Sequence, residues 1–336
     1  MRQRLRRGGR KEAPLTIVAG IDEAGLGPVL GPLVVSAAVF SVPDEVAGVS
    51  MWQLLAGAVA RRPGKRHTRI AIADSKALYG GLRGSRGLDR LERGVLAMLA
   101  TRGLLPQSLE GLLEIVCPPA VSEASVHPWY RRLDLELPRE QSAAEAALSA
   151  NALDAAMQQA GLRLLTLRSE TVFEAEFNRL TQATNKAQML LDVTCRLLMR
   201  LWQTAEDERI VIHVDRQGGR MRYLEPLARV FEGCSFKVLE ENETQSSYRL
   251  TASGRQAEIH FVVGGEDRQL PVALASMTSK YLRELFMQIY NSYWSAHVPD
   301  LAPTAGYYTD GKRFYEAIQP VARKMGVAEQ MLYRLK

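Results

Sequence analysis

The chain has 336 residues, of which 46% are hydrophobic and 24% are charged, and its formal net charge is +6. This much apolar material excludes a generally disordered chain and suffices for the core of one large domain or two smaller ones. Residues 1–11 hold six cations and no acid, so the rest of the chain is neutral on average. The net charge therefore points to a polyanionic partner only through this basic tail.

The first predicted strand, 16–22 (TIVAGID), ends where two acids, Asp22 and Glu23, stand side by side. Residues 23–32 contain three glycines and two prolines, which predict a turn. A second buried strand is predicted over 33–40 (LVVSAAVF). In a continuing strand the two acids would point to opposite faces, so both reach one site only if the chain bends, and the glycines permit a bend.

The next part of the chain alternates between helical and extended patterns. A helix is predicted over 44–60, a basic loop over 61–69 and a short strand over 70–73. This strand stops at the polar residues 74–76 (DSK). Leucine and valine residues at helical spacing predict another helix over 88–102.

The middle of the chain carries weaker patterns. A helix over 141–160 and a strand over 162–170 are predicted there. We interpret residues 105–165 as an insertion. Trp129 and Tyr130 could stack on nucleic-acid bases, but in an acidic segment we expect them to be local core.

The second half of the chain returns to clear patterns and supports an α/β fold. The predicted elements are a helix over 185–202, a strand over 208–215, a meander of strands over 236–265, a long helix over 271–294, and a helical end from 306–318 onward.

Acids follow three of the predicted strands directly: Asp22 with Glu23, Asp74, and Asp215. Functional groups of α/β proteins gather at strand ends, and carboxylates that meet there repel one another unless a cation binds. Mg²⁺ suits such a site, and two ions could assist phosphoryl transfer. The alternative for each single aspartate is that it caps a turn or a helix.

Three polar residues of the long C-terminal helix share one face, because Ser276, Lys280 and Glu284 are spaced four residues apart. This face could point toward the acidic site. The alternative is a surface ion pair between Lys280 and Glu284, which contributes only about 0.3–0.5 kcal/mol.

Five ordered motifs resemble those of the type 2 ribonucleases H, the bacterial ribonucleases HII and HIII. They are GIDEAGLGPVLGPLVVSAAV (20–39), ADSKAL (73–78), VIHVDRQGGR (211–220), GGEDRQLPVALASMTSKYLRE (264–284) and AGYYTD (305–310). The resemblance covers about residues 16–100 and 170–318.

This resemblance implies a ribonuclease H-like α/β fold, with a mixed central sheet flanked by helices, an inserted segment and C-terminal helices. Residues 1–14 would be a basic flexible tail, and residues 15–336 a catalytic domain with its insertion at about 105–165. The family's activity implies a metal-dependent endoribonuclease that cleaves the RNA strand of RNA–DNA hybrids, or ribonucleotides embedded in DNA, and leaves 5′-phosphate and 3′-hydroxyl ends.

The resemblance also assigns roles to individual residues. Four acids would be both catalytic and metal-binding, with Mg²⁺ or Mn²⁺ as the cofactor and two ions in the site: Asp22, Glu23, Asp215 and Glu284. Seven residues would contact the substrate: Gly25, Leu26, Gly27, Ser75, Lys76, Lys280 and Tyr307.

Two positions depart from the family's pattern. Ribonuclease HII has an arginine where this chain has Leu26, which puts recognition of single ribonucleotides in question but not the cleavage of longer hybrids. Glu284 matches a position that is usually aspartate in ribonuclease HII and glutamate in ribonuclease HIII. Two alternatives therefore remain: a nuclease of the same fold with altered substrate choice, and a module that binds hybrids without cleaving them.

Three widely spaced cysteines, with no Cys/His ligand spacing, indicate neither a disulfide framework nor a zinc site and favour a reducing compartment. No apolar run is long enough for a membrane span, and the basic start is not followed by the apolar stretch of a signal peptide. We expect a cytoplasmic protein, monomeric, with no membrane partner.

Overall fold

The computed structural model describes residues 14–64, 69–79, 85–140, 143–204 and 209–335. The predicted basic tail thus lies outside the described residues except for its last position, Pro14. None of the described helices is both long and apolar enough to cross a membrane.

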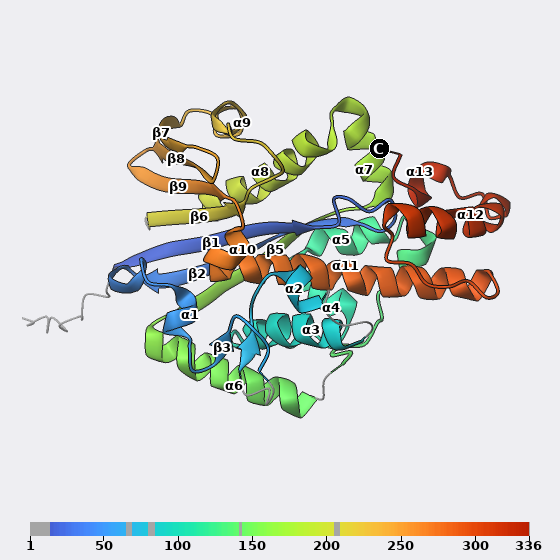
Figure 1. The fold of residues 1–336 in the computed structure, drawn as a ribbon, viewed down its shortest axis with the longest axis horizontal. Coiled ribbons are helices and arrows are strands. Elements are labelled where there is room, and N and C mark those ends of the chain that lie inside the picture. Colours follow the sequence, from blue (N-terminus) through green and yellow to red (C-terminus); the bar gives the residue numbers. More distant parts are fainter. Residues whose placement is uncertain (1–13, 65–68, 80–84, 141–142, 205–208, 336) are drawn as a thin grey trace, which may run out of the picture.

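A seven-stranded mixed sheet forms the centre of the fold, with the strand order β5-β2-β1-β6-β9-β8-β7 (Figure 1). Its strands are β1 (Leu15–Ala24), β2 (Leu33–Pro43), β5 (Arg163–Val172), β6 (Arg209–Asp215), β7 (Ser235–Glu241), β8 (Gln245–Ala252) and β9 (Arg255–Val262). The three central strands β1, β6 and β9 are parallel, and the other neighbouring pairs are antiparallel. The carboxyl ends of β1, β6 and β9 therefore meet at one edge of the sheet.

Helices cover both faces of this sheet (Figure 1). On one face lie α7 (Glu174–Ala183), α8 (Lys186–Thr204) and α9 (Leu224–Val230). On the other face lie α1 (Met51–Leu54), α2 (Ser75–Tyr79), α3 (Ser85–Ala100), α4 (Leu109–Val116), α5 (Pro118–Ala124), α6 (Ala143–Ala160) and α11 (Leu270–His297). The last two helices, α12 (Tyr308–Lys324) and α13 (Glu329–Leu332), lie at one end of the fold, where α13 packs against α7 (Figure 1). The short helix α10 (Gly265–Arg268) links β9 to α11.

Alternating side chains of the strands divide the core into two apolar layers. In β2, Val34 and Ala38 join the layer under α11, whereas Val35 and Ala37 join the layer under α8. This alternation is the period of two that a strand buried on both faces requires. The prediction of an α/β fold with a mixed central sheet flanked by helices is confirmed.

Helix α11 is the central support of the fold because it packs directly against β1 and β2. Its first turn contacts β1 at Gly20, where an added Cβ atom would lie 2.1 Å from the backbone nitrogen of Val272. Nineteen of its residues are buried. The strand that carries Asp22 and the helix that carries Ser276 are thereby held together.

The helix predicted over 44–60 is wrong. The segment instead forms the 3-10 turn η1 (Asp44–Val46), the single-turn helix α1 and the two-residue strand β3 (Val59–Ala60). Gly48 and Gly57 interrupt it, and glycine costs about 1 kcal/mol in a helix interior. Several of its apolar residues, among them Met51, Trp52 and Leu55, are buried without forming a regular helix.

The strand predicted over 70–73 forms, but only as β4 (Ile70–Ala71), and it pairs with β3 rather than with the central sheet. The predictions of helices over 141–160 and 185–202 and of the meander over 236–265 are confirmed by α6, by α8 and by β7, β8 and β9.

The helices α4, α5 and α6 and the turn that follows α5 each contribute buried residues to the apolar layer under α11. Trp129 and Tyr130, in the 3-10 turn η2 (Pro128–Tyr130), are 1% and 0% exposed and contact Tyr290 of α11. The expectation that both aromatic residues are local core is confirmed. The three cysteines are free, as expected from their spacing.

Candidate active site

Two of the predicted acids lie side by side at the carboxyl ends of β1 and β6. The parallel pairing of these strands ends at Ile21 and Val214, so Asp22 and Asp215 are the next residue on each strand. Neighbouring strands are about 4.8 Å apart, which places the two acids at one point of the sheet edge. The acids that follow these two strands in the sequence, Asp22 and Asp215, thus lie next to each other in the structure.

Asp22 is held from several sides and is only 7% exposed. One carboxylate oxygen, Oδ1, accepts a hydrogen bond of 2.8 Å from the backbone N–H of Glu23. The side chain of Ser276 on α11 hydrogen-bonds to the same carboxylate. The hydroxyl of Ser279, one turn further along α11, donates to the Asp22 carbonyl at 3.0 Å. The position of Asp22 is therefore fixed by α11 as well as by its own strand.

A fourth acid, Glu266, lies beside Asp215. The backbone N–H of Gly265 donates to Asp215 Oδ1 at 2.9 Å, and this contact brings the start of α10 against the end of β6. The carboxyl groups of Asp215 and Glu266 are also hydrogen-bonding neighbours, and this contact raises the pKa of Glu266 and lowers that of Asp215. The second oxygen of Glu266, Oε2, is buried and has no hydrogen-bond partner among the described residues.

Glu266 was not among the predicted site residues, although it carries the same sequence signal as the other acids. Glu266 follows the apolar strand residues of β9 after a pair of glycines, within the motif GGEDRQL. It therefore obeys the same strand-end rule as Asp22 and Asp215.

Burial and mutual repulsion disfavour the ionised form of all four acids. Burial is the main cause in each case, and a neighbouring carboxylate adds to it. The pKa of Glu23 is raised to about 7 by burial and then by Asp215, and that of Glu266 to about 7 by burial and then by Asp215. The pKa values of Asp22 and Asp215 are also raised. The cluster holds more negative charge than its surroundings neutralise.

Lys76 is the cation that faces this cluster. Burial acts to lower its pKa, but the carboxylates of Asp74, Asp22, Glu266 and Glu23 outweigh burial and raise it. Asp74 itself caps α2, because its two oxygens accept from the backbone N–H groups of Lys76 and Ala77 at 3.1 and 3.2 Å. The hydrogen bonds of Asp74 are therefore those of a helix cap, the alternative given above for this residue.

Ser75 joins α2 to the long helix, because its hydroxyl accepts from the Ser276 hydroxyl at 2.9 Å. Through this contact Lys76 is held at a fixed position relative to Asp22. Two of the predicted substrate-binding residues, Ser75 and Lys76, are therefore at the acidic cluster.

Glu284 makes a different set of contacts. It accepts from Lys280 Nζ at 2.6 Å and from the hydroxyl of Tyr79 at 2.7 Å. It stands two helical turns beyond Ser276, about 12 Å along the helix axis. Lys280 and Glu284 therefore form an ion pair, but their side chains are only 12% and 11% exposed, so it is not the surface ion pair given above as the alternative.

Tyr307 borders this second group of side chains and is 55% exposed. The pKa of the Tyr79 hydroxyl is raised, first by burial and then by Glu284, and Tyr307 adds to this effect. The predicted substrate residues Lys280 and Tyr307 thus lie with Tyr79 and Glu284, further along α11 than the four acids.

The glycine loop, residues 25–31, leaves the end of β1 with its backbone in an unusual conformation. Gly25 has a φ of +95°, and an added Cβ atom there would lie 2.7 Å from the side chain of Arg283. Gly27 is exposed, and nothing lies within 4 Å of the position of its missing Cβ atom. The backbone N–H groups of Gly25, Leu26 and Gly27 donate to no acceptor in the part of the chain that the structure describes. These groups are available to an anion.

The four acids Asp22, Glu23, Asp215 and Glu266 fit a hard divalent cation by their chemistry. As they lie in the described ranges, no three or more His, Cys, Asp or Glu side chains are placed so that they could hold a metal ion, so a cation would have to draw these carboxylates together. The donors are all carboxylate oxygens, the type that Mg²⁺ and Mn²⁺ prefer. A cation would also give the buried Oε2 of Glu266 a partner.

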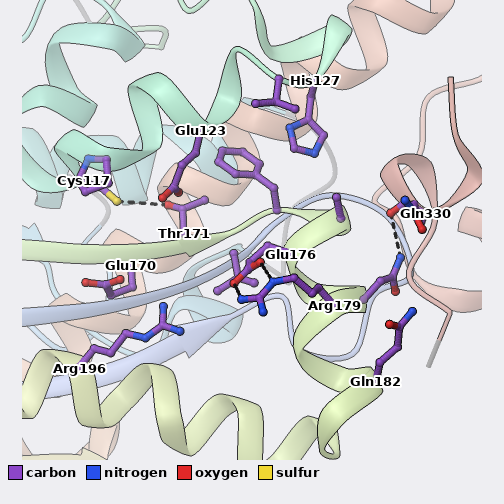
Figure 2. Close-up of a pocket in the computed structure, with 16 residues that line it drawn as sticks. Cys117, Glu123, His127, Glu170, Thr171, Glu176, Arg179, Gln182, Arg196 and Gln330 are labelled. Atoms are coloured by element: carbon purple, nitrogen blue, oxygen red, sulfur yellow. Dashed lines mark hydrogen bonds and ion pairs between the residues drawn. The ribbon is translucent and has the colours of Figure 1, made fainter.

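A cavity of about 600 Å³ lies apart from these acids, between α5, β5, α7 and α8 (Figure 2). Its walls carry charges of both signs, among them Glu123, Glu170, Glu176, Arg179 and Arg196. None of the four clustered acids lines it. The cavity is therefore not part of the candidate active site.

No protein-family model matches the chain, and no curated protein matches it. Several solved structures resemble it at low similarity. A chain of the PCNA:RNase HII complex from Archaeoglobus fulgidus is 14% identical, with a TM-score of 0.40 and coverage of 95% of this chain and 94% of the other. Bst-RNase HIII in complex with Mn²⁺ is 15% identical, with a TM-score of 0.42 and coverage of 96% and 67%. Ribonuclease H2 from Pyrococcus horikoshii OT3 is 13% identical, with a TM-score of 0.40 and coverage of 94% and 92%. TM-scores this low carry no argument about what this chain does.

Proposed function

We propose that the protein is a metal-dependent endoribonuclease that hydrolyses the RNA strand of RNA–DNA hybrids. The observation that carries this proposal is the convergence of Asp22, Glu23, Asp215 and Glu266 at the ends of neighbouring strands, beside Lys76. The ordered sequence motifs that resemble type 2 ribonucleases H support it. We include Glu266 among the metal-binding acids and assign Glu284 to the neighbouring pair with Lys280.

The four acids would hold one or two divalent cations, Mg²⁺ or Mn²⁺. When bound, such ions supply charge stabilisation to a phosphate in transfer and make water easier to deprotonate. Hydrogen bonds from α10 to the Asp215 carboxylate and from α11 to the Asp22 backbone hold these two residues at the same edge of the sheet.

The cations and N–H groups around the acids would place the nucleic-acid backbone. Lys76 stands at the acids, and Lys280 stands further along α11 with Glu284. Contacts of this kind orient a strand without reading its sequence. The free N–H groups of residues 25–27 add neutral donors for a phosphate or for a 2′-hydroxyl, the group that distinguishes RNA from DNA.

The cleavage assay that tests this function uses an end-labelled RNA–DNA hybrid with Mg²⁺ or Mn²⁺, and Asp22→Asn as the control variant. We expect metal-dependent cuts in the RNA strand by the wild type, with 5′-phosphate and 3′-hydroxyl ends, and a rate at least about 100-fold lower in the variant. Binding of the hybrid without cleavage in both proteins would overturn the enzyme in favour of a non-cleaving module.

Leu26 leads to a prediction about substrate choice. The loop has backbone donors but no arginine side chain at this position, so contacts to a single ribonucleotide are fewer. We expect continuous hybrids to be cleaved faster than a DNA duplex that holds one ribonucleotide. The comparison needs kcat/KM for both substrates at one salt concentration, and equal values would contradict the role given to Leu26.

A further inference from the structure

The carbonyl groups of the glycine loop are turned toward two buried arginines from distant parts of the chain. Arg334, which follows α13, donates from its guanidinium to the carbonyl oxygens of Gly25, Pro28 and Gly31. Its own backbone N–H donates to the Val29 carbonyl at 2.9 Å. One residue thus binds four of the seven carbonyl groups in residues 25–31.

The other contacts of the loop complete a rigid support. Arg283 of α11 donates to the Leu30 carbonyl at 3.1 Å, and the backbone N–H of Gly31 donates to Glu174 Oε1 at 3.0 Å. The N–H groups of Val29 and Leu30 donate to the carbonyl of Gly306 at 2.8 and 3.2 Å. The N–H groups of Val29, Leu30 and Gly31 are thus bound within the protein. The N–H groups of residues 25–27 have no acceptor among the described residues and are available to a ligand.

The segment that carries Arg334 is itself fastened to α7. The side chain of Asn178 donates to the carbonyls of Gln330 and Tyr333 at 2.9 and 2.8 Å and accepts from the backbone N–H of Leu335 at 2.8 Å. Gln330 lies where this segment reaches the cavity of Figure 2. The guanidinium of Arg334 also stacks on the ring of Phe177, 4.3 Å from its centroid.

Two buried cations lie behind the loop. Arg283 and Arg334 are each 1% exposed, and Glu174 interacts with both, while Arg283 Nη1 also lies 3.7 Å from Glu284 Oε1. Burial raises the pKa of Glu174 to about 7, against the opposing effect of Arg334. A phosphate at the outer side of the loop would interact with these cations through a poorly solvated region, where electrostatic interactions are weakly screened.

We propose that Arg334 is a positioning residue that holds the glycine loop with its N–H groups outward for a phosphate of the nucleic-acid backbone. The nucleic-acid ligand in this proposal rests on the proposed nuclease function. The support that Arg334 gives to the loop does not depend on that function. Arg334 does not touch the reacting atoms. It acts through residues 25–31, which begin directly after the strand that carries Asp22 and Glu23.

The test compares the wild type with Arg334→Lys in the full-length chain. Lysine keeps the positive charge beside Glu174 but lacks the fork of N–H donors that serves three carbonyls, so the protein should still fold. We expect amide hydrogen exchange of Val29, Leu30 and Gly31, the loop residues whose N–H groups are hydrogen-bonded, to become on the order of 10-fold faster, with no change in β6. We also expect the Kd for an RNA–DNA hybrid, measured by fluorescence anisotropy without divalent metal, to rise about 10-fold, as for loss of one charge-assisted hydrogen bond.

Two further variants make the result specific. Asn178→Ala loosens the segment without removing the guanidinium and should show the same changes at a smaller size, which also covers the case in which Arg334→Lys does not fold. Glu329→Gln disturbs a contact to Tyr315 in the same region but not the loop, and should leave exchange and Kd unchanged.

The outcomes separate this proposal from the proposed function. Unchanged exchange of Val29, Leu30 and Gly31, or faster exchange with an unchanged Kd, would overturn the role of Arg334. If the wild type binds hybrid but does not cleave it, the nuclease function fails while exchange and Kd still decide the role of Arg334. If the enzyme is active, Arg334→Lys should raise KM and leave kcat within about threefold of the wild type. The reason is that the lost contact weakens substrate binding in the ground state as much as in the transition state.

Discussion

Replacing Glu266 with glutamine should lower cleavage of an RNA–DNA hybrid on the order of 100- to 1000-fold, the usual cost of removing one electrostatic group. The reason is that Glu266 shares a hydrogen bond with Asp215 and adds to the charge around Asp22 and Glu23. Initial rates at saturating Mg²⁺ and substrate would measure the effect. Glu266→Gln keeps the size of the side chain, so a lost rate reports the charge.

Glu284→Gln is the matched control for this variant. Glu284 is ion-paired with Lys280 and hydrogen-bonded to Tyr79, and it stands about 12 Å along α11 from the serine that contacts Asp22. Its replacement should change the cleavage rate by less than about tenfold, chiefly through Lys280. The reverse order of effects, with Glu284→Gln inactive and Glu266→Gln active, would restore Glu284 as the fourth metal-binding acid.

Gly20→Ala should lower the free energy of unfolding by about 3 kcal/mol or more, the upper range for an overpacked core. A Cβ atom at this position would meet the backbone of Pro271 and Val272 at 2.1–2.6 Å, and backbone atoms cannot move aside as the end of a flexible side chain can. The first turn of α11 would have to leave β1, and Ser276 would lose its place beside Asp22. We therefore expect both stability and cleavage to fall.

Urea denaturation measures the first effect, with Gly48→Ala as the control. Gly48 is exposed and has no atom within 4 Å of the position of a Cβ atom, so its replacement should change the free energy of unfolding by no more than about 0.5 kcal/mol. An equal response of the two variants would contradict the close contact between β1 and α11.

The fold and the general place of the site could be predicted from the sequence because both depend on local patterns. Short apolar runs marked the buried strands β1, β2 and β6, and an acid at the end of a buried strand marked where the carboxylates would meet. The helix predicted over 44–60 failed because apolar content alone does not distinguish a helix from a buried irregular segment that contains Gly48 and Gly57.

The fourth acid shows the limit of such patterns. Helical spacing placed Ser276, Lys280 and Glu284 on one face, and this is how they lie, but a shared face says nothing about distance along the helix axis. The two turns between Ser276 and Glu284 take Glu284 to a different set of partners. Glu266 is nearer to Asp215 because α10 begins at the edge where β6 ends.

Long-range contacts are the part that no local pattern contains. Arg334 reaches Gly25 and Gly31 across about 300 positions of the sequence. A lone arginine after a short helix has no local feature that indicates a buried partner. Only the folded chain, in which α13 packs beside α7, brings the guanidinium to the loop.

The central claim, that the clustered acids form a divalent-cation site, is tested most directly by Mn²⁺ binding followed by electron paramagnetic resonance in the absence of nucleic acid. We predict that the wild type binds Mn²⁺ and that the double variant Asp22→Asn, Asp215→Asn loses this binding while it keeps the wild-type circular dichroism spectrum. Equal Mn²⁺ affinity and stoichiometry in the two proteins would contradict the claim.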